Sequence, residues 1–218
     1  MSEPTKMYQL VEIFCSIKGE GVNTGIPMMF IRFAGCNLNC PYCDTPNEVK
    51  LELTEKAILA RIASRTPSWI VFTGGEPGLQ LTNSLVEGAR EASPGVQLAL
   101  ESNGTVWNDA FVKLDYKVIS PKLGYPLALG WKEYLAEGGS LEELRYIITD
   151  AQSTLWNLAG IEQYTRYITI SPIFHGGRGD IHGTPDPIAV KRCVHLAWLY
   201  RKSNVRVSVQ VHKLIGVR

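Results

Sequence analysis

The sequence predicts an α/β protein in which about six parallel strands form an open, partial β/α barrel. Short apolar runs alternate with helix-like stretches along the chain. Repeated strand-then-helix units imply parallel strands joined by right-handed crossovers. Six or so strands are too few to close a barrel of eight such units. Polar motifs follow the ends of several predicted strands, so we expect these motifs to meet at one rim.

The predicted strands are runs rich in β-branched and aromatic residues. They cover residues 28–34, 69–73, 96–101, 116–120, 144–149, 167–171 and 205–211.

Four helices are predicted between or after these strands. The first starts after Thr54, a plausible cap, and carries Ile58, Leu59, Ile62 and Ala63 on one face. The others cover about 79–92, 151–163 and 187–201, the last after the start signal Thr184-Pro185-Asp186. Residues 124–139 read either as an irregular insertion or as a short helix around 132–136.

Composition and charge narrow the class of protein. The chain of 218 residues shows no repeat or obvious linker, and we expect one domain over 1–218. Its 22 basic and 21 acidic residues leave a net charge of +1, which gives no reason to expect nucleic acid or a membrane surface as a direct partner. The N-terminus lacks an apolar signal region, and an odd count of five cysteines suits a reducing cytoplasm.

Three cysteines form the most informative motif. Cys36, Cys40 and Cys43 have the spacing C-x3-C-x2-C directly after the strand at 28–34. Three thiolates can hold three corners of a [4Fe–4S] cubane and leave the fourth iron open for chemistry. The alternative is structural zinc, which normally takes four protein ligands. Its fourth ligand would have to be Cys15, Cys193 or a histidine, none at a standard spacing.

A glycine-rich turn follows the next strand. In Thr73-Gly74-Gly75-Glu76-Pro77 two glycines allow close approach of a ligand to the backbone, and a carboxylate can support an ammonium group. Taken alone, a simple strand-ending turn is an equal alternative.

Together these motifs resemble those of radical S-adenosylmethionine (SAM) enzymes, and further segments resemble the 7-carboxy-7-deazaguanine synthase family. The matching segments span the chain and are listed here: 12–21, Thr24-Gly25, 30–36, Cys43-Asp44-Thr45, 73–77, 101–105, Ser120-Pro121-Lys122 and Gln210-Val211-His212-Lys213. The resemblance implies a partial TIM-like barrel with a radical SAM core, a [4Fe–4S] cluster on the three cysteines, SAM and Mg²⁺.

The resemblance also implies a set of SAM contacts. Gly74, Gly75 and Glu76 would hold the amino group of SAM, and Tyr42 and Asp44 would lie beside its adenosyl part. Ser120, Pro121 and Lys122 would grip the ribose or the methionine carboxylate. Ser171, Pro172, Ile173 and Phe174 would approach the adenine. Ser171 stands where the family commonly has glutamine, so contacts there would involve mainly the backbone.

Arg32 is the clearest candidate for substrate binding. An arginine in an apolar strand is costly unless it meets an anion. The resemblance makes that anion the carboxylate of 6-carboxy-5,6,7,8-tetrahydropterin. An internal salt bridge to Glu12 or Glu20 is the alternative.

Other substrate contacts rest on the resemblance, which assigns them to Ile17, Lys18, Gly19, Glu20, Thr73 and Arg218. The carboxylate of Glu20 can pair with the amino-pyrimidinone edge of a pterin. Lys18 stands where the family usually has glutamine, which leaves its side-chain contact open. His212 follows the last predicted strand, and it can be interpreted equally well as a site residue or as a core histidine.

Thr45 is the expected magnesium residue, because Mg²⁺ prefers hard oxygen ligands. The alternative is a turn or helix cap formed by Asp44 and Thr45. The glycine-rich segment 175–183 reads as a surface loop, or alternatively as a lid.

The function implied by the resemblance is a ring-contracting lyase of queuosine and 7-deazapurine synthesis. A flavodoxin or ferredoxin would supply one electron, SAM would be cleaved to a radical, and the tetrahydropterin would become 7-carboxy-7-deazaguanine with loss of ammonia. A homodimer is expected from the same resemblance. The alternatives are a radical SAM activase of a glycyl-radical enzyme and a non-catalytic iron–sulfur or zinc protein.

Overall fold

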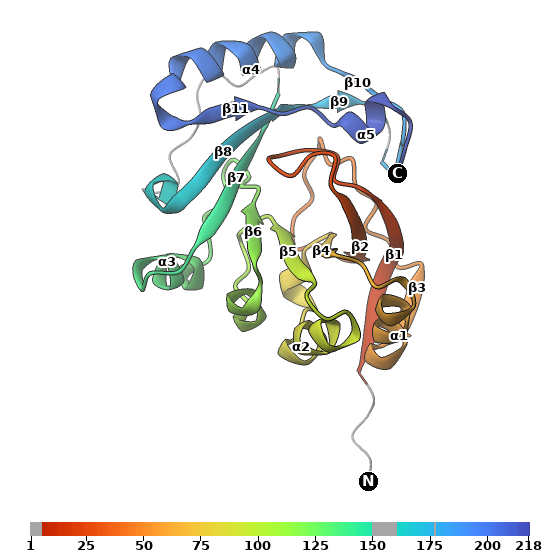
Figure 1. The fold of residues 1–218 in the computed structure, drawn as a ribbon. Coiled ribbons are helices and arrows are strands. Elements are labelled where there is room, and N and C mark those ends of the chain that lie inside the picture. Colours follow the sequence, from red (N-terminus) through yellow and green to blue (C-terminus); the bar gives the residue numbers. More distant parts are fainter. Residues whose placement is uncertain (1–5, 150–160, 177) are drawn as a thin grey trace.

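Nine strands form the central sheet, in the order β11-β8-β7-β6-β5-β4-β2-β1-β3. The computed structural model describes residues 6–149, 161–176 and 178–218. The seven strands from β11 to β2 are parallel neighbours, and β1 and β3 add antiparallel pairings at one end. The sheet curves, with α1, α2 and α3 outside it and α4 over β8 and β11 (Figure 1). The open, partial barrel is therefore confirmed, with seven parallel strands instead of about six.

The strands of this sheet are β1 (Met7–Ile17), β2 (Pro27–Phe33), β3 (Leu51–Thr54), β4 (Trp69–Gly74), β5 (Gln97–Ser102), β6 (Tyr116–Ile119), β7 (Leu141–Ile148), β8 (Thr165–Pro172) and β11 (Val205–Val207). A separate pair consists of β9 (Phe174–His175) and β10 (Thr184–Pro185).

Six predicted strands correspond to β2 and to β4 through β8, with ends shifted by a few residues. The prediction for 205–211 is wrong in its second half. Ser208 still donates its N–H to Ile170 O over 2.9 Å, but the chain then turns and forms α5 (Val211–Leu214). Val211 N donates instead to Gly19 O over 2.8 Å. This contact brings the last helix against the turn after β1.

The prediction lacked β1 and β3. A register shift between Leu10 and Glu12 interrupts the pairing of β1 with β2. Leu10 and Val11 are both buried as a result, so β1 does not show the simple alternation that identifies a strand.

The helices follow their predicted start signals. In α1 (Glu55–Arg65) the Thr54 hydroxyl accepts from Ala57 N over 3.2 Å, and in α4 (Pro187–Leu199) the Asp186 carboxylate accepts from Ala189 N over 2.7 Å. The helix expected from 79 begins later, as α2 (Asn83–Ala92), because Pro77–Leu79 form a 3₁₀ turn and Thr82 provides the cap.

Two further helix predictions lay in less regular sequence. A short helix is present between 124 and 139, as α3 (Leu129–Ala136). Of the helix expected at 151–163, residues 151–160 lie outside the described residues, and Ile161–Tyr164 form a 3₁₀ helix.

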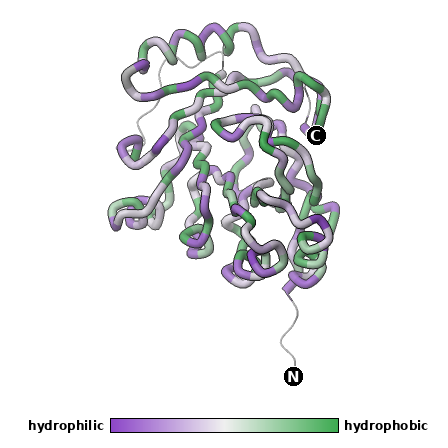
Figure 2. Tube along the Cα trace, in the orientation of Figure 1, coloured by the Kyte–Doolittle hydropathy of each residue, from purple (hydrophilic) through white to green (hydrophobic). Residues whose placement is uncertain are grey.

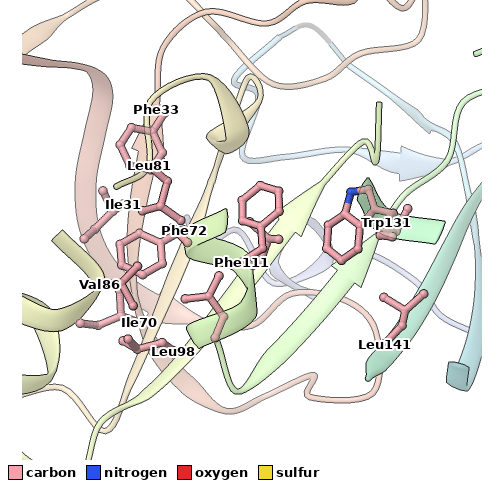
Figure 3. Packing of buried hydrophobic residues seen from close by; sticks show 14 of the residues in the cluster. Ile31, Phe33, Ile70, Phe72, Leu81, Val86, Leu98, Phe111, Trp131 and Leu141 are labelled. Atoms are coloured by element: carbon pink, nitrogen blue, oxygen red, sulfur yellow. The ribbon is translucent and has the colours of Figure 1, made fainter. Parts of the chain in front are cut away.

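The core lies between the sheet and the outer helices. Phe33, Phe72 and Leu98 project from β2, β4 and β5, and Figure 3 shows Phe72 beside Leu81 and Val86 from the α2 region. Apolar stretches run along the strands, while hydrophilic residues recur along the outer helices (Figure 2). Each fully buried side chain of this size stabilises the fold by about 1.5–3 kcal/mol. Packing in the core therefore holds the strand ends at the rim in fixed positions.

An aromatic cluster closes the core beneath α3. The rings of Trp107 and Trp131 meet edge to face with centroids 5.0 Å apart, and Phe111 stacks on Trp131 at 5.3 Å. Trp131 is fully buried and donates its indole N–H to Val106 O over 3.2 Å. The cluster fixes the segment that follows β5.

No helix among the described residues is both long and apolar enough to cross a membrane.

Candidate active site

The main cavity lies at the carboxyl ends of the parallel strands, where the sequence predicted a common rim. Its volume is about 180 Å³. Its lining includes the following predicted site residues: Glu20, Cys36, Cys40, Tyr42, Cys43, Asp44, Thr45, Thr73, Gly74, Gly75, Ser120, Lys122, Pro172, Ile173 and Phe174. The loops after β2, β4, β5, β6 and β8 therefore converge on one space.

The three cysteines occupy one side of this cavity, and all three are half-buried. Cys36 Sγ accepts from Leu38 N at 3.4 Å and from Asn103 Nδ2 at 3.9 Å. Burial raises the pKa of the Cys36 and Cys40 thiols, and the Lys122 ammonium opposes this effect at Cys40. A positive charge at this place favours the thiolate, which is the form that binds metal.

The glycine turn packs directly against the start of the cysteine loop. Gly75 N donates to Phe33 O over 3.0 Å, and Glu76 N donates to Gly35 O over 2.9 Å. A side chain at Gly75 would overlap the Gly35 carbonyl, and one at Gly74 would overlap the backbone of Phe33. The two glycines thus permit contact between the two loops as well as access to the cavity.

Glu76 lies beneath the cavity and is not part of its lining. Its carboxylate is fully buried and accepts from Gly78 N at 2.9 Å, Ser102 Oγ at 2.9 Å and Asn103 N at 2.8 Å. Burial raises the pKa of Glu76 against these hydrogen bonds. In this structure Glu76 joins the ends of β4 and β5, and its predicted contact with the SAM amino group stays a prediction.

Lys122 places a half-buried cation near the cysteines. Its ammonium donates to Ser120 O at 2.8 Å and to Ser120 Oγ at 2.7 Å. Burial lowers the pKa of Lys122, and negative charge on Cys40 and Cys43 opposes that shift. Ser120 therefore orients a cation that is available to an anionic ligand.

The floor of the cavity is a network of charged residues. Arg145 Nη1 lies 2.6 Å from Glu101 Oε1, and Lys18 Nζ approaches the same oxygen at 2.6 Å. Thr73 donates its hydroxyl to Glu101 Oε2 over 3.1 Å. Burial alone would raise the pKa of Glu101, but the charges of Lys18 and Arg145 outweigh burial and hold that pKa well below its usual range.

A second cavity adjoins the first and shares Asp44, Thr45 and Arg178 with it. Arg32 lies in this second cavity, where its Nε is 3.0 Å from Glu12 Oε1. Arg218 approaches the other oxygen of Glu12 at 2.7 Å. The internal salt bridge that was the alternative for Arg32 is thus present, and both arginines share one carboxylate.

Comparisons with known proteins agree with this site. A family model of the radical SAM superfamily matches residues 30–120. The 7-carboxy-7-deazaguanine synthase of Methanospirillum hungatei is 41% identical, over 96% of this chain and 86% of that protein. The chain belongs to the 7-carboxy-7-deazaguanine synthase family. The synthase of Neisseria meningitidis serogroup B is 33% identical, over 96% of this chain and 94% of its own length.

The fold agrees as well. The crystal structure of QueE from Escherichia coli superposes with a TM-score of 0.68 over 94% of each chain, at 22% identity. Membership of the radical SAM superfamily implies a [4Fe–4S] cluster and SAM as cofactors.

The residues fit the cofactors of this synthase family. Three thiols line one cavity, and Lys122 provides positive charge beside them. Among the described residues no three histidine, cysteine or acidic side chains converge closely enough for a single metal ion. A cubane distributes its three protein ligands over three irons, so it suits this wider arrangement better than a single zinc does.

Asp44 and Thr45 lie in the wall between the two cavities. Thr45 donates its hydroxyl to Asp44 Oδ1 over 3.2 Å, and Gln210 Nε2 donates to Asp44 Oδ2 over 3.0 Å. Burial would raise the pKa of Asp44, but Lys213 and these hydrogen bonds hold it below its ordinary value. Thr45 can offer a hard oxygen toward either cavity, so its magnesium role stays a prediction.

Other predicted residues lie outside the main cavity. Lys18 is buried beneath the floor, paired with Glu101. The remaining residues of this group are Ile17, Gly19, Pro121, Ser171 and Arg218, of which Arg218 lines the second cavity. Ser171 is fully buried, which suits the prediction of mainly backbone contacts there. His212 is half-buried in the second cavity, and burial lowers its pKa.

The glycine-rich loop reaches the cysteine loop. Gly179 N donates to Asp44 O over 2.8 Å, and Arg178 donates to Asn39 Oδ1 at 3.3 Å. Most of the described residues of this loop are exposed to solvent, as the surface-loop prediction requires, yet Arg178 lines both cavities.

Glu101 was expected at the rim without an assigned role, and four other cavity residues were missing from the predicted site, namely Asn103, Arg145, Arg178 and Gln210. Arg145 had a signal in the sequence. It lies two residues after Glu143 in the strand at 141–148, and two charges on one face of a buried strand indicate a shared polar surface.

Proposed function

We propose that the protein converts 6-carboxy-5,6,7,8-tetrahydropterin to 7-carboxy-7-deazaguanine with loss of ammonia. The observation that supports this proposal is that the site consists of two adjoining cavities with different linings. The cysteines and Glu20 line one cavity, and Arg32 and Arg218 line an adjoining one. A flat heterocycle with N–H donors at one end and a carboxylate at the other matches this arrangement.

When bound, the cluster and SAM supply the radical that starts the rearrangement. Cys36, Cys40 and Cys43 hold the cluster, and Gly74 and Gly75 leave backbone accessible beside it. Lys122, whose positive charge acts on Cys40, would donate to the carboxylate of SAM. The remaining side chains bind the pterin, orient it and exclude water, which is the protein's main contribution in such reactions.

Glu20 is the best partner for the amino-pyrimidinone edge. Its Oε2 is buried and has no hydrogen-bond partner among the described residues. A buried carboxylate oxygen without a donor is costly. Adjacent N–H groups of a pterin would remove that cost.

Arg32 and Arg218 suit the substrate carboxylate, because two guanidinium groups share the single carboxylate of Glu12. One positive charge therefore remains to be balanced, and an incoming carboxylate would balance it. Mg²⁺ held by Thr45, at the wall between the two cavities, would strengthen the same interaction.

The remaining expectations also belong to this proposal. A flavodoxin or ferredoxin in the cytoplasm would reduce the cluster, and the protein would act as a homodimer without direct contact to nucleic acid or membrane. The product would enter queuosine or another 7-deazapurine pathway.

The test is anaerobic turnover of the reconstituted protein with SAM, a reductant and the tetrahydropterin, followed by mass analysis. We expect 7-carboxy-7-deazaguanine and ammonia. Cleavage of SAM without the deazaguanine product would reject the proposed substrate.

An Arg32→Ala variant tests the role of the second cavity in substrate binding. It should bind the tetrahydropterin about tenfold or more weakly, because a hydrogen-bonded charge pair is lost, and it should retain SAM cleavage without substrate. Wild-type affinity in this variant would mean that Arg32 serves only Glu12.

A further inference from the structure

Arg145 connects three carboxylates that come from different parts of the chain. Its guanidinium lies 2.6 Å from Glu101, 2.9 Å from Glu143 and 3.5 Å from Glu20. Its side chain is only 4% exposed, yet it lines the main cavity. A planar guanidinium with five N–H donors can hold several carboxylates in fixed directions, which an ammonium group cannot do.

The turn that carries Glu20 is built around this arginine. Gly21 has φ +82°, and a side chain there would overlap Arg145 Nη2. Val22 N donates to Glu143 Oε2 over 3.3 Å, and Gly21 N donates to Ser208 Oγ over 2.7 Å. Arg145 and Glu143 therefore support the turn from below, and Glu20 has little freedom to move.

The charges of this network do not cancel. Three carboxylates (Glu20, Glu101 and Glu143) face two cations (Lys18 and Arg145). The other oxygen of Glu101 accepts from Thr73 at 3.1 Å, and Glu143 accepts from Thr169 at 2.5 Å and from Tyr116 at 3.2 Å. Only Glu20 keeps a buried oxygen with no partner among the described residues of this network.

We propose that Arg145 is a positioning residue that holds Glu20 and Glu101 in place at the floor of the cavity and so determines the affinity for the pterin. The inference rests on the proposed function and deepens it. Arg145 acts through Glu20, which it directs toward the N–H donors of the ligand. Without the guanidinium, the three carboxylates would repel one another and Glu20 would lose its fixed direction.

The experiment compares Arg145→Met and Arg145→Lys with the wild-type holoenzyme. KM and kcat for the tetrahydropterin are measured between pH 6 and 9, together with SAM cleavage in the absence of pterin. At pH 7 we expect Arg145→Met to raise KM about tenfold or more, from the loss of charge-assisted hydrogen bonds. Pterin-independent SAM cleavage should remain within about twofold, because the SAM contacts are separate from the floor.

The dependence on pH separates positioning from a merely structural role. The charged and titratable groups that face Arg145 are Lys18, Glu20, Glu101, Glu143, Lys122 within the same cavity and, through Glu143, Tyr116. In Arg145→Met one of the two cations that oppose the effect of burial on Glu101 is lost, so the floor takes up a proton at a higher pH than in the wild type. The ratio of variant to wild-type KM should therefore fall as pH rises. The KM of Arg145→Lys should lie between those of the wild type and Arg145→Met, because lysine restores the positive charge but not the planar set of N–H donors.

Arg90→Met is the matched control. Arg90 pairs with Asp115 at 3.0 Å, away from both cavities, and its loss should leave KM unchanged. A KM within about twofold of wild type in both Arg145 variants would overturn the inference. An equal loss of pterin turnover and SAM cleavage would overturn it as well. If Arg145→Met does not fold, Arg145→Lys decides alone by the same criteria. If the wild type fails to turn over the tetrahydropterin, the proposed function fails and takes this inference with it.

Discussion

Lys213 Nζ lies 2.5 Å from Asp44 Oδ2, which joins the last helix of the chain to the residue that follows the third cysteine. Lys213 is nearly buried, and its ammonium also lies over the ring of Phe174, 5.6 Å from its centroid. Gln210 reinforces the link through the same oxygen of Asp44. The C-terminal segment is therefore part of the cluster site, although it is distant in sequence.

A Lys213→Met variant should load the cluster less completely and lose it faster in air. The change leaves the half-buried Asp44 carboxylate without its cation, which weakens the attachment of the cysteine loop to the C-terminal helix. The measurement is iron and sulfide content after reconstitution, followed by the rate of bleaching under oxygen. Lys191→Met, on the exposed face of α4, is the control. Equal bleaching rates in the two variants would show that the link does not support the loop.

Cys40→Ala should abolish the cluster absorbance near about 400 nm. Two of the three thiolates are too few to retain the cubane in an open cavity. The control is Cys15→Ser, because Cys15 is exposed and outside both cavities. Unchanged colour and iron content in Cys40→Ala would reject cluster ligation by this loop.

Gly75→Ala should destabilise the protein by up to about 3 kcal/mol, as expected for overpacking against backbone that cannot yield. Its methyl group would overlap the Gly35 carbonyl beside Cys36. We also expect SAM affinity to fall, measured by equilibrium dialysis alongside urea unfolding. Gly138→Ala is the control, because a methyl group at Gly138 meets open space and is strained by the left-handed backbone alone. This change should cost about 1 kcal/mol and leave SAM binding intact. Normal stability of Gly75→Ala would mean that the two loops are free to separate.

The cluster-free protein should lose stability as the pH falls below about 4.5, the region of ordinary glutamate pKa values. Lys18 and Arg145 hold the pKa of Glu101 below that of the unfolded chain despite its burial. The unfolded chain therefore takes up a proton first, and acid favours unfolding. The contribution of Glu101 is fully present above this region and is lost progressively below it.

A Glu101→Gln variant tests this assignment. It should be less stable at pH 7 and should lose less stability between pH 5 and 3.5 than the wild type does, as measured by urea midpoints. Glu137→Gln, at an exposed site after α3, should follow the wild-type curve. An unchanged acid slope in Glu101→Gln would assign the acid sensitivity to other carboxylates.

The sequence predicted the rim because each motif follows an apolar run that could only be a buried strand. Cys36, Thr73 and Ser120 are all placed by this rule, and they line one cavity. The direction of the Glu76 side chain could not be predicted in this way. Its carboxylate turns toward Ser102 and Asn103 at the end of the adjacent strand, and this direction depends on how two strands align.

The C-terminal contacts were beyond prediction for a related reason. Gln210 and Lys213 were recognised as part of a motif, but the predicted strand ran through Gln210 to Val211, and the short helix Val211–Leu214 was not predicted. Only the turn after Val207 brings them to Asp44. The pairing of Arg32 with Glu12 was foreseen as an alternative, and in the structure the two residues lie opposite each other in β1 and β2.

The half-buried indole of Trp107 and the fully buried indole of Trp131 have a practical consequence. Their segment reaches the metal-binding loop through Thr105, whose hydroxyl accepts from Asn37 over 2.8 Å. Iron–sulfur centres absorb broadly across the wavelengths at which tryptophan emits, so loaded protein should fluoresce weakly. Emission that brightens on exposure to air would then report the loss of iron in real time, without any attached dye.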